Sequence, residues 1–329
     1  MHQTADQPVD RPIIPAGDRP RAMEAYNAAR VRSRYGIPRS RLAQWIGSGL
    51  SSMNLVAPGL ALQVTSRLFL SPPRSPQRTA PSQARAERFS VDSGRTRLAC
   101  YRWALPGRQR APTAFMVHGW GGRALQFDAF VEPLLQAGFS VIAPDLPAHG
   151  QSTGRVTNVF EFKRAILDLG QHVGAPSVVI AHSFGCMATS LALRDGLSPQ
   201  AVVFVAPMTS FQFAVDSFAD QLSLSASLKA RAESHFEQRF AISRAGLEHR
   251  TLAPTWALPL LVIHDRNDSV VPPSMGQALA AAWPGAELVE TRGLGHRRVL
   301  DSSEVVEQAL RFIGGSHGAE VGSTPAVGA

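Results

Sequence analysis

One serine stands where the sequence favours nucleophilic chemistry. The run Val178 to Ala181 is apolar and mostly β-branched, as in a buried strand, and helix-forming residues follow Ser183. A sharp turn from strand to helix exposes a serine hydroxyl but strains its backbone, so the residues two before and two after it must be small. Ala181 and Gly185 occupy these positions. The pattern predicts Ser183 as a nucleophile, although alone it also fits an ordinary strand end.

A serine hydroxyl reacts poorly near neutral pH unless a base lies within hydrogen-bond reach and a third group orients that base. Later segments of the chain supply both kinds of residue. Asp265 and Asp268 follow an apolar run, and His296 lies in a glycine-rich segment near the C-terminal end. The alternative for His296 is a surface histidine. Cys186 falls inside the expected helix and is not placed as a nucleophile.

A second glycine-rich segment follows the expected strand 113–117 directly. It reads His118-Gly119-Trp120-Gly121-Gly122, and its main-chain N–H groups are unshielded, as the donors of an oxyanion hole must be. A phosphate-binding loop is not indicated, because the lysine and the serine or threonine of that motif are missing.

With these motifs in this order, the chain resembles the α/β-hydrolase superfamily from about residue 88 to residue 315. The resemblance implies that the N–H groups of Trp120 and Phe184 form the oxyanion hole. It also implies that the triad acid is Asp268, which lies shortly before a Val-Pro pair, with Asp265 as the rival acid. The family's structural Asp-x-Pro-Gly-His-Gly-x-Ser turn is matched at 145–152.

The chain departs from the family pattern at two glycines, which are replaced by Ala148 and Ala181. A metal site made of His118, His149, His182 and Asp145 is a weaker alternative, because these residues lack ligand spacing on a shared helix face. We therefore expect no metal and no organic cofactor.

The elements that position these residues alternate between short apolar strands and amphipathic helices. We expect an α/β fold, a mostly parallel, roughly eight-stranded sheet with helices on both faces. The strands are expected at 89–92, 97–103, 113–117, 140–144, 177–181, 201–205, 259–264 and 287–291. The helices are expected at 125–137, 159–172, 184–194, 274–282 and 302–313. Active sites in such sheets lie beyond the carboxyl ends of the strands.

The long segment 208–255 interrupts this alternation and is predicted to form a small helical cap, with helices at 211–222 and 226–240. Its phenylalanines either line an apolar acyl or alcohol pocket or pack the cap onto the body: Phe211, Phe213, Phe218, Phe236 and Phe240. The hydrolase domain is expected over 86–315, with a flexible tail over 316–329.

Composition supports a globular chain with an unusual N-terminal part. The 329 residues carry a formal net charge of +8. Residues 1–112 hold 18 Arg and 6 acidic residues, a charge of +12, which leaves −4 for the rest. Nucleic-acid binding is not expected, since no aromatic interleaving or recognised module accompanies the arginines. The two cysteines, Cys100 and Cys186, are predicted to be buried thiols.

Residues 1–85 are expected to form an Arg- and Pro-rich N-terminal tail with short amphipathic helices. About the first 40 residues are expected to be mobile, although 21–34 could form a short helix. Residues 71–85 are expected to be a linker. The stretch 42–66 has no charged residue, but polar side chains and a Pro-Gly pair argue against a membrane span. We expect two short helices over 42–70 that lie on the domain or contact a membrane surface peripherally. A secretory signal is not indicated, and a cytoplasmic location is expected.

The expected function is that of a serine hydrolase, carboxylesterase-like, that cleaves a carboxylic ester or thioester. Ser183, His296 and Asp268 would form the triad, and a small-molecule ester or acyl compound would be the substrate. A peptidase, lactonase or acyltransferase would use the same residues, because substrate class is set by the cap and pocket. A non-catalytic binding or membrane-associated module is the alternative from another class. The sequence leaves the oligomeric state open.

Overall fold

The computed structural model describes residues 40–73, 80–104, 107, 111–242, 244–253 and 257–318. The expected mobile N-terminal segment with its short helix at 21–34, the middle of the expected linker at 74–79, and the expected tail beyond 318 lie outside these residues.

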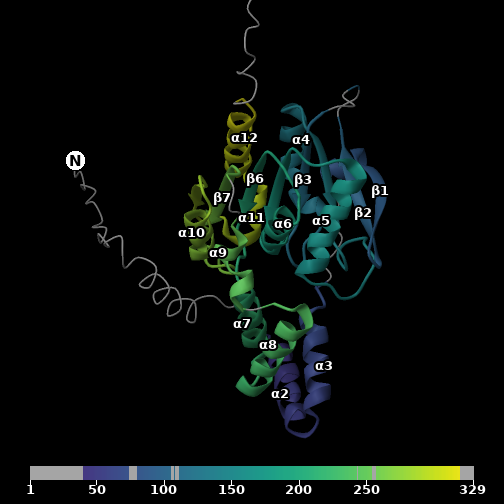
Figure 1. Ribbon diagram of the computed structural model, residues 1–329, viewed down its shortest axis with the longest axis vertical. Coiled ribbons are helices and arrows are strands. Elements are labelled where there is room, and N and C mark those ends of the chain that lie inside the picture. The colour runs from purple at the N-terminus through teal and green to yellow at the C-terminus, as the bar shows by residue number, and fades with distance from the viewer. Residues whose placement is uncertain are drawn as a thin grey trace, which may run out of the picture. The chain divides into compact units, whose positions relative to one another are not determined.

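A single eight-stranded sheet positions everything else in the described part of the chain (Figure 1). Its strand order is β1-β2-β4-β3-β5-β6-β7-β8. Strands β1 and β2 pair antiparallel, as do β2 and β4, and all other neighbours run parallel. The strands are β1 Glu87–Ser93, β2 Thr96–Trp103, β3 Thr113–Val117, β4 Ser140–Pro144, β5 Val178–His182, β6 Ala201–Val205, β7 Leu260–Asp265 and β8 Glu287–Thr291. The predicted α/β fold with a mostly parallel sheet is confirmed.

Helices cover both faces of this sheet because its central strands are apolar on both sides. Strands β5, β6 and β7 are buried at every position. Alternate residues face opposite helix layers: Val179 packs with α5, α6 and α10, whereas Ile180 packs with α4 and α12. The helices are α4 Asp128–Gln136, α5 Val159–Val173, α6 Phe184–Arg194, α10 Pro273–Ala282, α11 Gly295–Arg298 and α12 Ser303–Gly318.

The segment between β6 and β7 forms helices α7 Phe211–Leu222, α8 Ala226–Phe240 and α9 His249–Leu252. Ser210 and Ser225 begin α7 and α8 by accepting main-chain N–H groups of the first turn. Ser210 also donates to the carboxylate of Glu248, 2.8 Å away, which joins the two ends of the insertion at its base.

Two further helices from the N-terminal part, α2 Arg41–Val56 and α3 Pro58–Phe69, pack on this insertion, α2 against α7 and α3 against α8 (Figure 1). Phe69 at the end of α3 contacts three aromatic rings of the insertion, at centroid distances of 6.2 Å to Phe211, 5.2 Å to Phe218 and 4.6 Å to Phe236. Phe211 and Phe236 are buried. These contacts favour the packing role for Phe211, Phe218 and Phe236, which pack against α3.

No helix in the described ranges has both the length and the apolar character needed to cross a membrane. Both cysteines are free and buried, as predicted. Burial raises the pKa of the Cys100 thiol to about 12 and that of Cys186 well above its ordinary value, so neither is a ready thiolate near neutral pH.

Candidate active site

Ser183 lies at the carboxyl end of β5, in a strained turn that leads into α6. Its backbone has φ 54° and ψ −121°, an unfavourable conformation for a residue with a side chain. A Cβ on Gly185 would lie 2.6 Å from the carbonyl oxygens of Val117 and His118, so only glycine fits there without displacement. The turn is fixed by the Ser183 N–H, which donates to the Val205 carbonyl oxygen at 3.0 Å. The turn holds the hydroxyl beyond the sheet.

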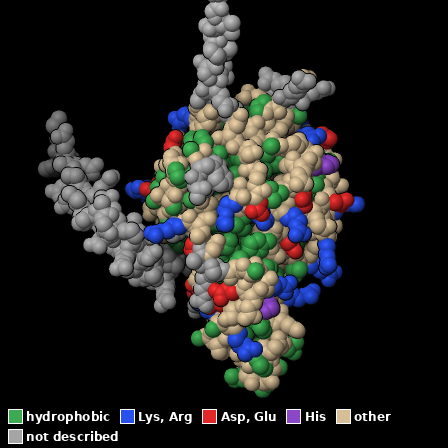
Figure 2. Space-filling view, in the orientation of Figure 1, with side chains coloured by type: hydrophobic (Ala, Val, Ile, Leu, Met, Phe, Trp, Pro, Cys, Tyr) green, Lys and Arg blue, Asp and Glu red, His purple; other side chains and the backbone are tan. Residues whose placement is uncertain are grey.

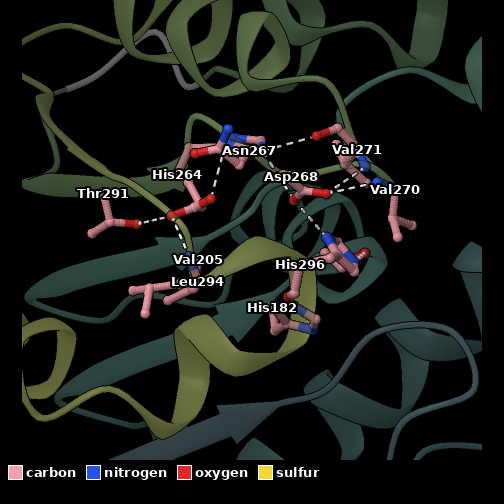
Figure 3. Close-up of polar contacts among 12 residues, drawn as sticks. His182, Val205, His264, Asn267, Asp268, Val270, Val271, Thr291, Leu294 and His296 are labelled. Carbon is pink, nitrogen blue, oxygen red and sulfur yellow. Dashed lines mark hydrogen bonds and ion pairs between the residues drawn. The ribbon is translucent and has the colours of Figure 1, made fainter. Parts of the chain in front are cut away.

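His296 lies in the short helix α11, which follows β8, and it connects Ser183 to an acid. Its Nε2 is 3.0 Å from Ser183 Oγ, and its Nδ1 is 2.7 Å from Asp268 Oδ2. With the proton on Nδ1, the ring donates to the carboxylate and accepts the serine hydroxyl proton at Nε2. Figure 3 shows the imidazole directed toward Asp268. The structure therefore brings the three predicted side chains into one hydrogen-bonded chain.

Asp268 is buried at the end of β7 and is held by the main chain that follows it. Its Oδ1 accepts the N–H groups of Val270, at 2.8 Å, and Val271, at 2.9 Å (Figure 3). Burial acts to raise the pKa of this carboxyl. Hydrogen bonds from His264, His296 and Val271 outweigh burial and bring the pKa well below its ordinary value. Asp268 is therefore a carboxylate near neutral pH.

His264 is a site residue that the sequence analysis missed. It is buried on β7, its Nε2 donates to the Val271 carbonyl oxygen at 3.1 Å, and the same atom lies 3.3 Å from Asp268 Oδ2. A Cβ on Gly276 would lie 2.6 Å from the His264 Nδ1, so α10 packs closely against this ring. The signal in the sequence is only its place at the end of the strand before the acid.

Asp265, the rival acid, bonds to the loop that carries His296. Its Oδ2 accepts from Thr291 Oγ1 at 2.8 Å and from the Leu294 N–H at 3.0 Å, and its Oδ1 accepts from the Asn267 N–H at 2.9 Å. This carboxylate stabilises the approach to α11, whereas Asp268 contacts the imidazole.

His182, next to the serine, was considered in the sequence only as a ligand of a metal site, and the structure gives it a different contact. Its Nε2 donates to the main-chain carbonyl oxygen of His296 at 2.9 Å, and its ring centroid lies 4.7 Å from that of His296. Burial, with a contribution from nearby His296, lowers the pKa of His182 to about 3. The neutral ring thus fixes the main chain of the candidate base.

Two more buried histidines join the glycine-rich loop to the turn 145–152. His118 Nε2 accepts the Leu146 N–H at 2.9 Å, and His149 Nε2 accepts the Gly121 N–H at 2.9 Å. Burial is the main cause that lowers the pKa of His118 to about 4 and of His149 to about 3, so both rings are neutral acceptors. The structure gives these histidines hydrogen-bonding roles, and the residues it describes include no group of three or more His, Cys, Asp or Glu that could hold a metal ion.

Trp120 and Phe184, the residues expected at the oxyanion hole, lie side by side, with ring centroids 5.4 Å apart. Gly119 sits against the serine turn, since a Cβ there would be 2.9 Å from Ser183 Cβ and 3.3 Å from the Phe184 nitrogen. Within the parts of the chain that the structure describes, neither the Trp120 N–H nor the Phe184 N–H donates to an acceptor. Neither N–H is thus occupied by a protein acceptor, as the donors of an oxyanion hole require.

The comparison with known families agrees with this fold. Residues 114–309, more than half of the chain, match the model of the alpha/beta hydrolase family, and the chain belongs to that family. Among curated proteins, it is 36% identical over 116 residues to the magnesium-chelatase 30 kDa subunit of Rhodobacter capsulatus, covering 33% of this chain and 40% of that protein.

The chain is also similar to the monoglyceride lipase of Rattus norvegicus, with 31% identity over 133 residues, 38% of this chain and 43% of that lipase. It thus spans about two fifths of the length of these two relatives. Among solved structures, an esterase of Pyrococcus furiosus superposes with a TM-score of 0.55 at 20% identity, over 74% of this chain and 98% of that one. That similarity reflects the fold.

Proposed function

We propose that the protein is a serine hydrolase that cleaves a carboxylic ester or thioester through an acyl-serine intermediate. The observation that carries this proposal is the unbroken hydrogen-bonded chain from Ser183 Oγ through the His296 imidazole to Asp268 Oδ2. The name of the rat relative, a monoglyceride lipase, supports an ester as substrate.

In the first half-reaction, Ser183 Oγ attacks the carbonyl carbon of the ester while its proton passes to His296 Nε2. The carbonyl oxygen becomes an oxyanion and accepts the N–H groups of Trp120 and Phe184. When the tetrahedral intermediate collapses, the bond to the alcohol or thiol breaks, and His296 returns the proton to this leaving group. An acyl group then remains on Ser183.

In the second half-reaction, water attacks the acyl carbon and gives a proton to His296. Collapse of this intermediate breaks the bond to Ser183 Oγ, which regains the proton, and a carboxylic acid leaves. Asp268 stays ionised throughout and stabilises the imidazolium, a role consistent with its lowered pKa.

The experiment that tests the proposal is hydrolysis of a chain-length series of nitrophenyl esters by the wild-type protein and a Ser183→Ala variant. We expect turnover in the wild type and only background with Ser183→Ala. Cys186→Ala is the matched control, because Cys186 is a buried thiol three positions further along the same turn and helix, and it should keep its turnover. Turnover that survives in Ser183→Ala would refute the serine mechanism.

A fluorophosphonate probe separates the remaining alternatives. Labelling of Ser183 without ester turnover would indicate a different acyl substrate, such as a peptide or lactone. No labelling together with no turnover would favour a non-catalytic binding module.

A further inference from the structure

The exposed apolar side chains of the protein gather on α2 and α3. Seven of the ten large hydrophobic residues that are exposed among the described residues belong to these two helices: Leu42, Trp45, Ile46, Leu55, Val56, Leu60 and Leu68. Trp45 is 77% exposed, Leu55 82% and Val56 85%. Figure 2 shows hydrophobic side chains at the lower end of the molecule, where Figure 1 places α2 and α3.

The opposite face of α2 packs closely against the cap. At Gly47, α2 approaches the end of α7 so closely that a Cβ would lie 1.5 Å from the Leu222 carbonyl oxygen. Asn54 Nδ2 donates to Ser227 Oγ at 3.2 Å, and Ser51 Oγ accepts the Ser225 N–H at 2.9 Å. Gly47, Ser51 and Asn54 therefore face the cap, together with Leu50, which packs with Leu228 of α8. Trp45, Leu55 and Val56 face outward.

The charge pattern around this surface is equally uneven. From Leu42 to Ser66 the chain has no charged residue, while Arg41 and Arg67 stand at its two ends. Residues 30–41 contain five arginines and no acidic residue. An apolar helix face that carries a tryptophan next to a basic segment is typical of helices that lie in the interface of an anionic bilayer.

We propose that the outward face of α2 and α3 docks the protein onto a lipid bilayer with anionic head groups. The helices lie in the plane of the interface: α2 has 16 residues and is about 24 Å long at about 1.5 Å per residue, shorter than the hydrocarbon core of about 30 Å. A second copy of the chain is the alternative occupant of this face, and the oligomeric state in solution distinguishes it from a bilayer.

Docking on this face would bring the cap to the lipid surface, because α2 and α3 pack on α7 and α8. The chain that leaves α3 passes the glycine-rich loop, where a Cβ on Gly121 would be 3.0 Å from the ring of Pro73. The docking helices are thus joined to the cap by packing and to the neighbourhood of Trp120 by the chain. Docking itself requires no turnover, so it is tested independently of the proposed hydrolase activity.

The test is sedimentation of the full chain with vesicles of phosphatidylcholine alone and of phosphatidylcholine with phosphatidylglycerol. We expect the wild type to pellet with the anionic vesicles. The triple variant Trp45→Ser/Leu55→Ser/Val56→Ser should bind them at least about tenfold more weakly, since removal of even one large apolar contact lowers the affinity by about that factor. In 1 M salt, where screening is nearly complete, the preference for anionic lipid should disappear.

Leu288→Ser is the matched control, because Leu288 is an exposed apolar residue on β8, away from α2 and α3, and its loss should not change pelleting. The melting temperatures of both variants report that they fold. Wild-type protein that stays in the supernatant with both vesicles, or a triple variant that pellets like the wild type, would overturn the proposal. If the wild type forms a concentration-dependent dimer and does not bind vesicles, and the triple variant is monomeric, the proposal is overturned in favour of a second copy.

Discussion

The Nε2 of His182 lies 2.9 Å from the main-chain carbonyl oxygen of His296, so the residue beside the candidate nucleophile holds the backbone of the candidate base. The side chain of His296 in turn reaches Ser183 Oγ at 3.0 Å. His182 and Ser183, which are adjacent in the chain, thus contact the main chain and the side chain of His296. The position of His296 is therefore fixed by His182 at the end of β5 as well as by Asp268.

This relationship predicts that His182 acts as a positioning residue. His182→Ala removes the donor to the His296 carbonyl oxygen, and we expect kcat to fall about tenfold with little change in KM, the effect of misplacing a general base. His182→Gln keeps a donor on a side chain of similar reach and should restore part of the rate. Steady-state kinetics on a nitrophenyl ester distinguish the two variants. A kcat of His182→Ala equal to that of the wild type would show that this hydrogen bond does not matter for turnover.

Asp265, the last residue of β7, and Asp268, which follows the strand, should respond differently to the loss of charge. Asp268→Asn leaves His296 without its carboxylate, and we expect kcat to fall by about 10⁴-fold, as for the acid of a serine triad. Asp265→Asn weakens the hydrogen bonds to Thr291 and Leu294, so we expect the free energy of unfolding to fall by about 1–3 kcal/mol while much of the activity remains. Urea unfolding and kcat on the two variants test the assignment, and the reverse pattern would exchange the two roles.

The buried His149 should make stability depend on pH. Its pKa is lowered from 6.5 to about 3, chiefly by burial, so below pH 6.5 the unfolded chain binds a proton that the folded chain does not. Folding stability from this group is therefore complete above pH 6.5 and is lost as pH falls, by up to about 1.4 kcal/mol per pH unit.

The variant His149→Gln has no titrating group at this position, so this difference in proton binding between the unfolded and folded states is lost. We expect its free energy of unfolding to lie below that of the wild type at pH 7.5, and the difference to narrow by about 1.4 kcal/mol per pH unit below pH 6. Urea titrations at pH 5, 6 and 7.5 measure this difference. A gap that stays constant with pH would mean that His149 carries a proton in the folded state.

Two glycines of α2 offer a test of how the hairpin of α2 and α3 is held. A Cβ at Gly47 would lie 1.5 Å from the Leu222 carbonyl oxygen, whereas one at Gly49 would meet nothing within 4 Å. Gly47→Ala should therefore separate α2 from α7 and lower the free energy of unfolding by about 1–3 kcal/mol. Gly49→Ala should raise it by up to about 1 kcal/mol, because alanine favours the helix. Similar stability of the two variants would contradict the close packing at Gly47.

The sequence was a good guide to the sheet and to the three side chains that meet at its edge. The bounds of β3, β4, β6 and β8 match the predicted ranges. For β3, β4 and β6, short apolar runs between turn residues leave little freedom in where a buried strand begins and ends. Ser183, Asp268 and His296 all follow strands, and parallel strands end at one edge of the sheet. The order of these motifs along the chain was therefore sufficient to predict that the three residues meet.

Sequence patterns did not show the contacts that depend on distant partners. His182 reaches the carbonyl oxygen of a residue 114 positions away, and no spacing rule predicts a side chain that bonds to main chain at that separation. The same holds for α2, whose Leu50 is buried and whose Leu55 is exposed, although both stand in one uncharged stretch. Only the cap, itself an irregular insertion, decides which apolar residue lies inside.

The packing of Phe69 among the rings of Phe211, Phe218 and Phe236 determines where the folding unit of this protein begins. The family match starts at residue 114, yet α3 already supplies one wall of the cap's aromatic cluster. A chain cut back to the matched region would expose the ring of Phe236 to solvent, and the exposed apolar surface of the cap would favour aggregation. The natural boundary for expressing this hydrolase alone therefore lies ahead of Arg41, outside the limits that define its family.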